Sequence, residues 1–314
     1  KNVWVPGSSG MVAKSLISKL NEKKICYKAT NRKNLDLTNY KKIDKFLQKN
    51  NFDTIIMCAA KVGGIYANDN YSGDFIRENL LIQLNTIELA RVHKIKKLVF
   101  LGSSCIYPKN AKQPILEDYL LSGKLEKTNE SYAIAKIAGI KMIQAYRKQY
   151  GCDFISLMPT NLYGENDNFH SYNSHVVPAL INKIYNAKKD KKNSLMLWGT
   201  GNPKRDLLYV GDLADALIML TENYSDYEPI NIGSNNEITI SKLSKKISKI
   251  LNYKGKIIFN PKFPNGTIRK ILSIQKIKKF GWKPKTSLDK GLEQTVKWFL
   301  KNEKKIQYSS NKFR

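Results

Sequence analysis

The sequence has few acidic residues, few cysteines and no long apolar run. Asp and Glu make up only 26 of its 314 residues, against 54 Lys and Arg, so that the formal net charge is +28. The four cysteines (Cys26, Cys58, Cys105 and Cys152) show neither metal-ligand spacing nor the density of a disulfide framework. With no apolar run of roughly 18 residues and no signal peptide, we expect a cytoplasmic protein with free thiols, no metal and no membrane partner.

The excess of positive charge is compatible with a nucleic-acid partner, because Lys and Arg neutralise backbone phosphates. The lysines are spread along the whole chain, however, and Asn and Ile are also abundant, which is typical of a compositional bias. The basic run at 188–193 (KKDKKN) is interpreted as a solvated loop. We therefore expect no nucleic-acid partner, and we expect part of the charge to attract an anionic substrate such as a nucleotide diphosphate.

A glycine-rich turn lies between the first expected strand and the first expected helix. The strand covers 3–5, the turn reads GSSGMVA at 7–13, and helical periodicity follows at 14–20. This strand–turn–helix context is the one in which such a pattern binds a dinucleotide. Gly7 permits the tight turn, and Gly10 lets a pyrophosphate approach the N-terminus of the helix.

Alternating strands and helices predict an α/β fold of the Rossmann type, with a doubly wound parallel sheet. From about residue 165 short segments alternate with polar turns, which predicts a smaller C-terminal α/β domain. The first domain is expected to cover 1–164, with a return at about 207–234, and the second 165–206 and 235–314, with a polar tail from 307. Further strands are expected at 25–29, 54–60, 97–102 and, as the sixth, 154–159, and long helices at 74–93 and 130–149.

Tyr132 and Lys136 lie four residues apart in the second long helix, and therefore on one face of it. An ammonium group beside a phenol stabilises the phenolate and lowers the pKa of the tyrosine. Such a tyrosine can exchange a proton near neutral pH. Tyr-x-x-x-Lys is a weak motif alone, but here it follows the glycine-rich turn and a GSSCIY segment at 102–107, directly after a buried strand.

Together these motifs resemble the extended short-chain dehydrogenases/reductases. Four segments narrow the resemblance to the GDP-L-fucose synthase family, the GDP-4-keto-6-deoxy-mannose 3,5-epimerase/4-reductases. They are AAKVGGI at 59–65, LGSSCIYP at 101–108, YAIAKIAG at 132–139 and PTNLYG at 159–164. The similarity extends from the first strand to about Phe299, which is nearly the whole chain.

The resemblance implies a reductase centre of three residues. Tyr132 would donate a proton to a carbonyl oxygen while hydride reaches the carbonyl carbon. Lys136 would tune Tyr132 and bind the nicotinamide ribose. Ser103 would hydrogen-bond the same oxygen, and it is preferred over Ser104 because it lies four residues before Tyr107, as in the family.

The resemblance also implies that Cys105 and His175 act as base and acid when C3 and C5 of the sugar are inverted. Related dehydratases carry a Thr-Asp-Glu turn whose carboxylates manage the loss of water, and Ser104 and Cys105 replace those carboxylates here, which disfavours dehydration. A thiol and an imidazole suit proton removal next to a ketone. The alternatives are a buried, inert Cys105 and a structural His175, with His170 as the rival histidine.

The second expected strand ends in Thr-Asn-Arg-Lys at 30–33, without the acidic residue that binds the ribose of NAD. Arg32 favours a 2′-phosphate, so NADP(H) is the expected cofactor. Ser9 stands where the family often has a second basic residue. The cofactor contacts implied by the resemblance are Gly7, Ser8, Ser9, Gly10, Met11, Val12, Arg32, Asp36, Leu37, Ala59, Tyr132, Lys136, Pro159, Asn161 and Leu162.

A GDP-sugar substrate needs cations for its diphosphate and an apolar slot for guanine. The resemblance places this site at Asn161, His175, Lys183, Trp198, Arg205, Arg269 and Lys270. It also implies a homodimer in which the helices 74–93 and 130–149 of two chains form a four-helix bundle. The apolar positions Ile137, Ile140 and Ile143 are equally compatible with the core of a single chain.

These features lead us to expect an NADPH-dependent, bifunctional 3,5-epimerase/4-reductase that converts GDP-4-keto-6-deoxy-D-mannose to GDP-L-fucose. One alternative is a paralogue, with or without epimerase activity, that acts on another GDP-4-keto sugar, such as a 3,6-dideoxyhexose or a 6-deoxyheptose. A more remote alternative is a non-catalytic Rossmann protein that binds RNA, against which the set of Ser103, Tyr132 and Lys136 argues.

Overall fold

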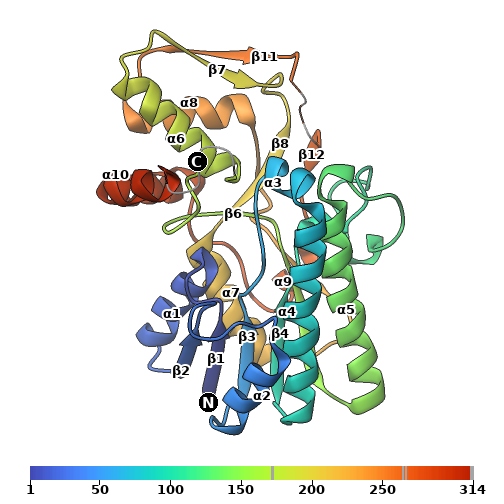
Figure 1. Cartoon of the computed structure of the whole chain (residues 1–314). Coiled ribbons are helices and arrows are strands. Elements are labelled where there is room, and N and C mark those ends of the chain that lie inside the picture. Colours follow the sequence, from blue (N-terminus) through green and yellow to red (C-terminus); the bar gives the residue numbers. More distant parts are fainter. Residues whose placement is uncertain (171–172, 264, 266, 312–314) are drawn as a thin grey trace.

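The computed structural model describes residues 1–170, 173–263, 265 and 267–311 (Figure 1). Its main element is a six-stranded parallel sheet in the order β2-β1-β3-β4-β5-β9. The strand expected as the sixth is the fifth along the chain, and it pairs with β9. The strands are β1 (Asn2–Pro6), β2 (Cys26–Thr30), β3 (Thr54–Met57), β4 (Lys97–Leu101), β5 (Asp153–Pro159) and β9 (Ile230–Ile232).

Helices cover both faces of this sheet, which confirms the doubly wound fold (Figure 1). One face packs on α2 (Tyr40–Gln48), α4 (Ser72–Val92) and α5 (Glu130–Tyr150). The other packs on α1 (Met11–Glu22) and α7 (Val210–Asn223). The inner strands β1, β3, β4 and β5 are buried on both sides and are therefore mostly apolar, as in the fully buried TIIM of β3, whereas the edge strand β2 is partly exposed.

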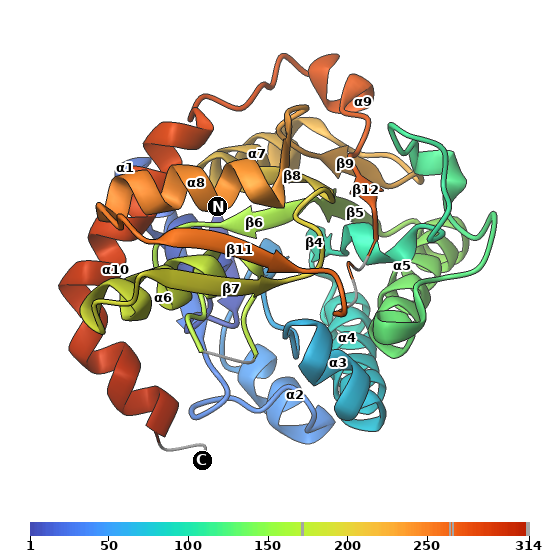
Figure 2. The same ribbon diagram turned by 90° about the horizontal axis from the view of Figure 1, so that it is seen from above.

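A smaller half lies beyond the carboxyl ends of the main strands (Figure 1). Its four-stranded sheet runs in the order β10-β8-β12, with β6 also paired to β8, and a separate pair joins β7 to β11 (Figure 2). The strands are β6 (Asn161–Tyr163), β7 (Ser194–Trp198), β8 (Lys204–Tyr209), β10 (Glu237–Thr239), β11 (Lys256–Asn260) and β12 (Arg269–Lys270). The helices α6 (Val176–Lys189), α8 (Ile240–Leu251) and α10 (Leu288–Asn311) enclose its core.

Two sequence-based expectations differ from this arrangement. The return to the main sheet at about 207 begins later, because β8 pairs within the smaller sheet and only α7 and β9 rejoin the main one. The polar tail expected from residue 307 is helical as far as Asn311, at the end of α10, and residues 312–314 lie outside the described part. None of the described helices is long and apolar enough to cross a membrane.

Short helical segments complete the edge of the sheet that faces the smaller half. They are α3 (Ile65–Asn70), η1 (Ser104–Ile106), η2 (Glu117–Tyr119), η3 (Lys127–Asn129) and α9 (Gln275–Lys278). In a doubly wound sheet, ligands bind outside the carboxyl ends of the strands. The turn after β1, the η1 segment after β4 and the start of α5 therefore mark the region in which a site is expected.

Candidate active site

The glycine-rich turn has the geometry that dinucleotide binding requires. Gly7 has φ +89°, and a Cβ atom there would lie 2.7 Å from the backbone N and Cα of Ala59. Only glycine combines this backbone conformation with such a close approach. The N–H groups of Gly7 and Ser8 each donate to the Thr30 carbonyl at 2.8 Å, which anchors the turn to β2. The remaining predicted contacts, Ser9, Gly10, Met11 and Val12, continue into the first turn of α1.

Arg32 lies just beyond β2, where the sequence predicts a 2′-phosphate contact. Its Nη1 is 2.8 Å from Glu78 Oε2, and its side chain is 69% exposed. Lys61 shares the same carboxylate, with Nζ 2.7 Å from Glu78 Oε1. The guanidinium is therefore accessible to solvent but already forms an ion pair. Glu78 would compete with a 2′-phosphate for Arg32, which the motif did not predict.

Asp36 and Leu37 lie in the loop that follows β2. The Asp36 carboxylate accepts hydrogen bonds from the backbone N–H and the hydroxyl of Thr38, at 3.0 and 2.9 Å, and the backbone bond is the main reason that its pKa is lowered. Leu37 is buried, and its carbonyl accepts from Asn85 Nδ2 at 3.0 Å. The Asp36 carboxylate and the Leu37 carbonyl thus order the loop that follows β2.

Tyr132 and Lys136 do not interact in the way that the Tyr-x-x-x-Lys motif predicts. Burial raises the pKa of Tyr132, whose hydroxyl is hydrogen-bonded to Ser103. Lys136 Nζ donates to the Leu101 carbonyl at 2.7 Å and lies 5.8 Å from the centroid of the Tyr132 ring. The expectation that the ammonium lowers the tyrosine pKa is therefore wrong for this structure, because desolvation of the phenolate dominates.

Lys136 is itself strongly affected by burial. Desolvation lowers its pKa from 10.5 to about 8, and only 4% of the residue is exposed. It is held between α5 and the end of β4, with Nζ 4.7 Å from the centroid of the Phe100 ring. The placement suits a residue that orients a ligand at the carboxyl end of β4.

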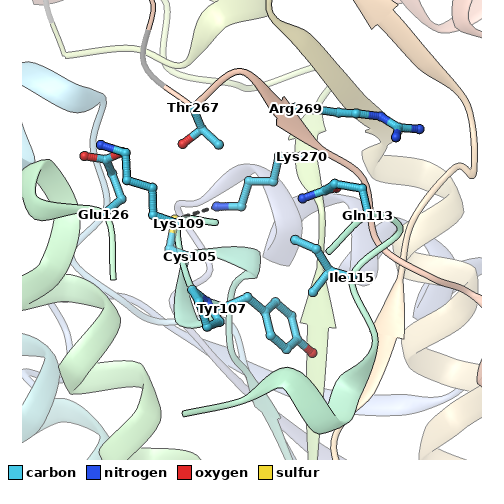
Figure 3. A pocket seen from close by; sticks show the side chains of 10 residues that line it. Cys105, Tyr107, Lys109, Gln113, Ile115, Glu126, Thr267, Arg269 and Lys270 are labelled. Carbon is cyan, nitrogen blue, oxygen red and sulfur yellow. Dashed lines mark hydrogen bonds and ion pairs between the residues drawn. The ribbon is translucent and has the colours of Figure 1, made fainter. Parts of the chain in front are cut away.

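Cys105 lies in the middle of η1, and polar side chains contact its sulfur. Ser103 precedes η1, and its Oγ accepts from the Cys105 N–H at 3.2 Å. The sulfur receives two hydrogen bonds, from Asn129 Nδ2 at 3.3 Å and from Lys270 Nζ at 3.7 Å. Figure 3 shows the Lys270 amine directed at Cys105 in a small pocket that Gln113 and Thr267 also line.

His175 immediately precedes α6 and is exposed to solvent. Protein nevertheless surrounds the ring closely enough that desolvation lowers its pKa. The rival His170 is engaged within its own loop, where Nδ1 accepts from the Asn173 N–H at 3.4 Å. The hydrogen bonds to the Cys105 sulfur come from Asn129 and Lys270, so within the described residues they do not join it to His175.

Two residues predicted to bind GDP meet on the outer surface of the smaller half. Lys183 Nζ lies 5.4 Å from the centroid of the Trp198 ring, and burial lowers its pKa. Trp198 is 59% exposed and stacks on Phe263, with ring centroids 4.8 Å apart and an interplanar angle of 6°. Phe263 was missed, because it lies in a polar turn without periodicity, although an aromatic residue in that turn was itself a signal.

The other predicted cations lie on the neighbouring strands β8 and β12. Arg205 Nη1 donates to the carbonyls of Thr267 at 2.6 Å and Lys204 at 2.8 Å, and burial lowers its pKa. Arg269 Nε donates to Glu237 at 2.7 Å. Lys270 pairs in register with Arg205 but points to Cys105. The structure therefore brings Lys270 to the sulfur, although the sequence predicts it at the diphosphate.

Pro159, Asn161 and Leu162 connect the two halves of the molecule, from the end of β5 into β6. Asn161 Nδ2 donates to the Asp206 carbonyl at 3.4 Å. The Asp206 carboxyl is fully buried, and desolvation raises its pKa to about 6. The Asp206 carboxylate also accepts a hydrogen bond from the Ser234 N–H at 3.0 Å. Asp206 therefore fixes the backbone segments around Asn161, a role that no motif indicates.

Residues 3–233 match the model of the NAD dependent epimerase/dehydratase family. The chain belongs to this family. It is 50% identical over 302 residues to a GDP-L-fucose synthase from Sinorhizobium fredii, with 96% of each chain covered. It is 41% identical over 317 residues to the GDP-L-fucose synthase of Escherichia coli, with 98% of this chain and 99% of that one covered.

Solved structures of the family have the same fold. A GDP-L-fucose synthetase from Naegleria fowleri, determined with NADP bound, superposes with a TM-score of 0.90 at 26% identity. The match covers 97% of this chain and 95% of the other. The fold expected from the alternation of strands and helices is thereby confirmed.

Proposed function

We propose that this protein is an NADPH-dependent, bifunctional 3,5-epimerase/4-reductase that converts GDP-4-keto-6-deoxy-D-mannose to GDP-L-fucose. The observation that carries the proposal is the meeting of three groups at the ends of β4 and α5. The Tyr132 hydroxyl is hydrogen-bonded to Ser103, and it lies close enough to Cys105 that a charge on the sulfur raises its pKa. A plain ketoreductase needs the first two groups, whereas the third supplies a base beside them.

The relatives support the choice of substrate. Proteins named GDP-L-fucose synthase match this chain over nearly its full length, at 50% and 41% identity. The same catalytic residues can act on several sugars, so they do not identify the substrate. The choice of sugar is supported instead by the similarity over the full length of the chain. A cytoplasmic location agrees with the free cysteines and with the lack of a membrane-spanning helix among the described residues.

The cofactor half of the site fits NADP(H). A Cβ at Gly7 would clash with the backbone of Ala59, so the tight turn before α1 requires glycine there. The N–H groups at the start of α1 would bind the pyrophosphate, and Arg32 would bind the 2′-phosphate after exchanging its partner Glu78. When bound, the reduced nicotinamide supplies a hydride for the C4 ketone of the sugar.

In the reduction, Tyr132 is the proton donor. Its hydroxyl gives a proton to the C4 oxygen, and the resulting charge on the phenol oxygen is stabilised by the Ser103 hydroxyl. The pKa of Tyr132 is raised by burial, which keeps the hydroxyl protonated and ready to donate. Lys136, anchored at the Leu101 carbonyl, orients the ribose of the cofactor and offsets the developing negative charge.

In the epimerisation, Cys105 removes a proton from a carbon next to the ketone. The charge moves onto the ketone oxygen, where Tyr132 and Ser103 stabilise it as in an oxyanion hole. His175 returns a proton to the opposite face of the same carbon, which inverts it. Lys270, 3.7 Å from the sulfur, is placed to stabilise negative charge on Cys105 before the proton is taken.

We propose that two chains form a homodimer through α4 and α5. Ile137, Ile140 and Ile143 are buried within the single chain and cannot supply the interface. Leu81, Leu84 and Ile134 are instead exposed, at 37%, 51% and 43%. An exposed apolar strip on two packed helices suits the four-helix bundle, and light scattering of a Leu84→Glu variant tests it against wild type.

The test of the function is product identification. The protein is incubated with GDP-4-keto-6-deoxy-D-mannose and NADPH, and the sugar of the product is determined by NMR. GDP-L-fucose supports the proposal, and a D-configured 6-deoxy sugar shows reduction without epimerisation. If NADPH is not consumed, the proposal is wrong, and retention on heparin rather than GDP-agarose across a salt series then supports an RNA-binding role.

A further inference from the structure

Asn129 has an unusual conformation for a residue at the start of a helix. It ends η3 and is the N-cap of α5, the helix that carries Tyr132 and Lys136. An Asn at an N-cap usually accepts a hydrogen bond from a backbone N–H of the first turn. The Asn129 side chain makes no such bond, and its Nδ2 lies 3.3 Å from the Cys105 sulfur instead.

This conformation has a second unfavourable feature. Asn129 Oδ1 is buried and has no hydrogen-bond partner in the structure. An unused cap and a buried acceptor without a donor both lower stability. Residues that break such local rules are expected at functional sites, where the lost stability is exchanged for a required geometry.

The position of Asn129 on the helix links Cys105 to the reductase centre. Asn129 comes three residues before Tyr132 and seven before Lys136, so that all three project along one side of α5. A single rigid helix thus carries the proton donor Tyr132 and also contacts the sulfur of the proposed base. The contact between Asn129 and the sulfur therefore ties Cys105, in the η1 segment after β4, to the helix that carries Tyr132.

The polarity of the contacts indicates what the sulfur does. Asn129 and Lys270 approach it from segments 24 and 165 residues away, and both present hydrogen-bond donors. A thiol sulfur accepts hydrogen bonds only weakly, whereas a negatively charged thiolate accepts them strongly. Two donors directed at one sulfur are therefore placed to hold it in position and to interact with negative charge that develops there.

We propose that Asn129 is a positioning residue, which holds the Cys105 sulfur through its side-chain N–H and fixes it relative to Tyr132 for proton removal. This inference rests on the proposed epimerase function. It assigns to the N-cap of α5 a role in the reaction that the motif around Tyr132 does not include.

The test compares substitutions that separate positioning from capping. Asn129→Asp can still cap α5 but replaces the donor with a negatively charged acceptor. Asn129→Ala removes both, and Asn129→Ser keeps a cap that is too short to reach the sulfur, which provides a second variant if Asn129→Ala does not fold. Asn223→Ala is the matched control, because Asn223 is an exposed residue at the end of α7 that bonds only locally, to Met219.

Two readouts are used. Deuterium incorporation at C3 and C5 in D₂O reports epimerisation, and peptide-resolved mass spectrometry after iodoacetamide treatment at pH 7 reports the reactivity of Cys105 without any substrate. We expect Asn129→Ala and Asn129→Ser to slow the exchange roughly 10–100-fold, and Asn129→Asp to slow it more, with NADPH affinity unchanged within about twofold. Alkylation of Cys105 should slow in the same order.

Two results would overturn the inference. If Asn129→Asp matches wild type while Asn129→Ala is slow, the side-chain N–H of Asn129 is not required and the positioning role is wrong. If all three variants match wild type in both readouts, Asn129 has no influence on the sulfur. If wild type makes no GDP-L-fucose but Cys105 alkylation still falls in the variants, the positioning role is supported while the proposed function fails.

Discussion

The cofactor half and the substrate half of this site are built in different ways. The cofactor half depends on backbone groups, such as the Gly7 and Ser8 N–H groups that donate to the Thr30 carbonyl at 2.8 Å. The substrate half depends on side chains from distant segments, such as Lys270 on Cys105, 165 residues apart, and Arg205 on Thr267, 62 residues apart.

This difference determines which residues of each half can be substituted without loss of structure. A turn held by backbone geometry tolerates few substitutions, since a Cβ at Gly7 would meet Ala59 at 2.7 Å. A pocket formed by side chains on loops and short strands can exchange one residue without moving the sheet. We therefore expect the cofactor half to be shared widely among related folds, and the choice of sugar to be made in the substrate half.

The largest expected effect is at Tyr132, where the halves meet. Tyr132→Phe removes the proton donor and should reduce NADPH consumption by about 10⁴-fold or more, to below detection. Exchange at C3 and C5 should persist, because Cys105 and His175 are unchanged. The measurements are NADPH absorbance and deuterium incorporation, and near-normal NADPH consumption would disprove the assignment.

Substitutions of Cys105 and His175 should affect the substrate half alone. Cys105→Ser keeps the size but removes the thiolate, and His175→Asn removes the proton donor on the opposite face. Each should slow deuterium incorporation about 10²–10⁴-fold and leave NADPH binding intact. Some variants should reduce the unepimerised ketone and release a D-configured 6-deoxy sugar.

The control for this pair is His170→Asn, since His170 is the rival histidine and is engaged in its own loop. It should exchange at C3 and C5 at the wild-type rate. If both Cys105→Ser and His175→Asn incorporate deuterium at the wild-type rate, these residues are structural. Epimerisation then cannot be assigned to them or separated from reduction by these substitutions.

The same contrast explains how much of the site could be predicted from the sequence. Gly7 and the Tyr132–Lys136 spacing were recognisable because turn geometry and helix periodicity act over a few residues. Five of the six strands and the two helices α4 and α5 were found for the same reason, whereas β9 was not predicted as a strand. The boundary at 207 was misplaced, because an apolar strand looks alike in either sheet, and only pairing places β8 in the smaller one.

Contacts across long sequence distances could not be predicted. Nothing in the local sequence pairs Arg32 with Glu78, Lys270 with Cys105 or Trp198 with Phe263. The pKa of Tyr132 was predicted to fall, since the motif contains the lysine but not the burial that desolvates the phenolate. Charge, burial and pairing are properties of the folded chain, and they decide the chemistry of the substrate half.

A smaller effect is expected at Arg32, a part of the cofactor half that depends on a side chain. Arg32→Ala should lower the ratio of kcat/KM for NADPH over NADH roughly 10–100-fold, since only NADPH carries the 2′-phosphate. Glu78→Gln is the matched variant, because it frees Arg32 from its ion pair and should raise the ratio. An unchanged ratio in Arg32→Ala would place phosphate recognition elsewhere.

The smallest expected effect concerns stability at Lys136, whose pKa is lowered from 10.5 to about 8 by burial. The unfolded chain therefore binds more protons than the folded one between these values, so the free energy of unfolding should rise as pH increases from about 8 to 10.5. The penalty of the buried ammonium is fully present below pH 8, at roughly 3 kcal/mol as an upper value.

Lys136→Met removes this pH-dependent penalty but also leaves the Leu101 carbonyl without its donor, at a cost of about 1–3 kcal/mol. The two contributions nearly cancel at pH 7, so the midpoint of urea unfolding should change little there while activity is lost. At pH 10 wild type should have gained stability relative to the variant, because its ammonium is then deprotonated in the folded state. Urea titrations of both proteins at pH 7 and 10 give the difference directly, and the other lysines contribute equally to both. A difference that does not change with pH would mean that the Lys136 amine is solvated in the folded protein, and that it resembles the surface cations of the substrate half more than a buried part of the cofactor half.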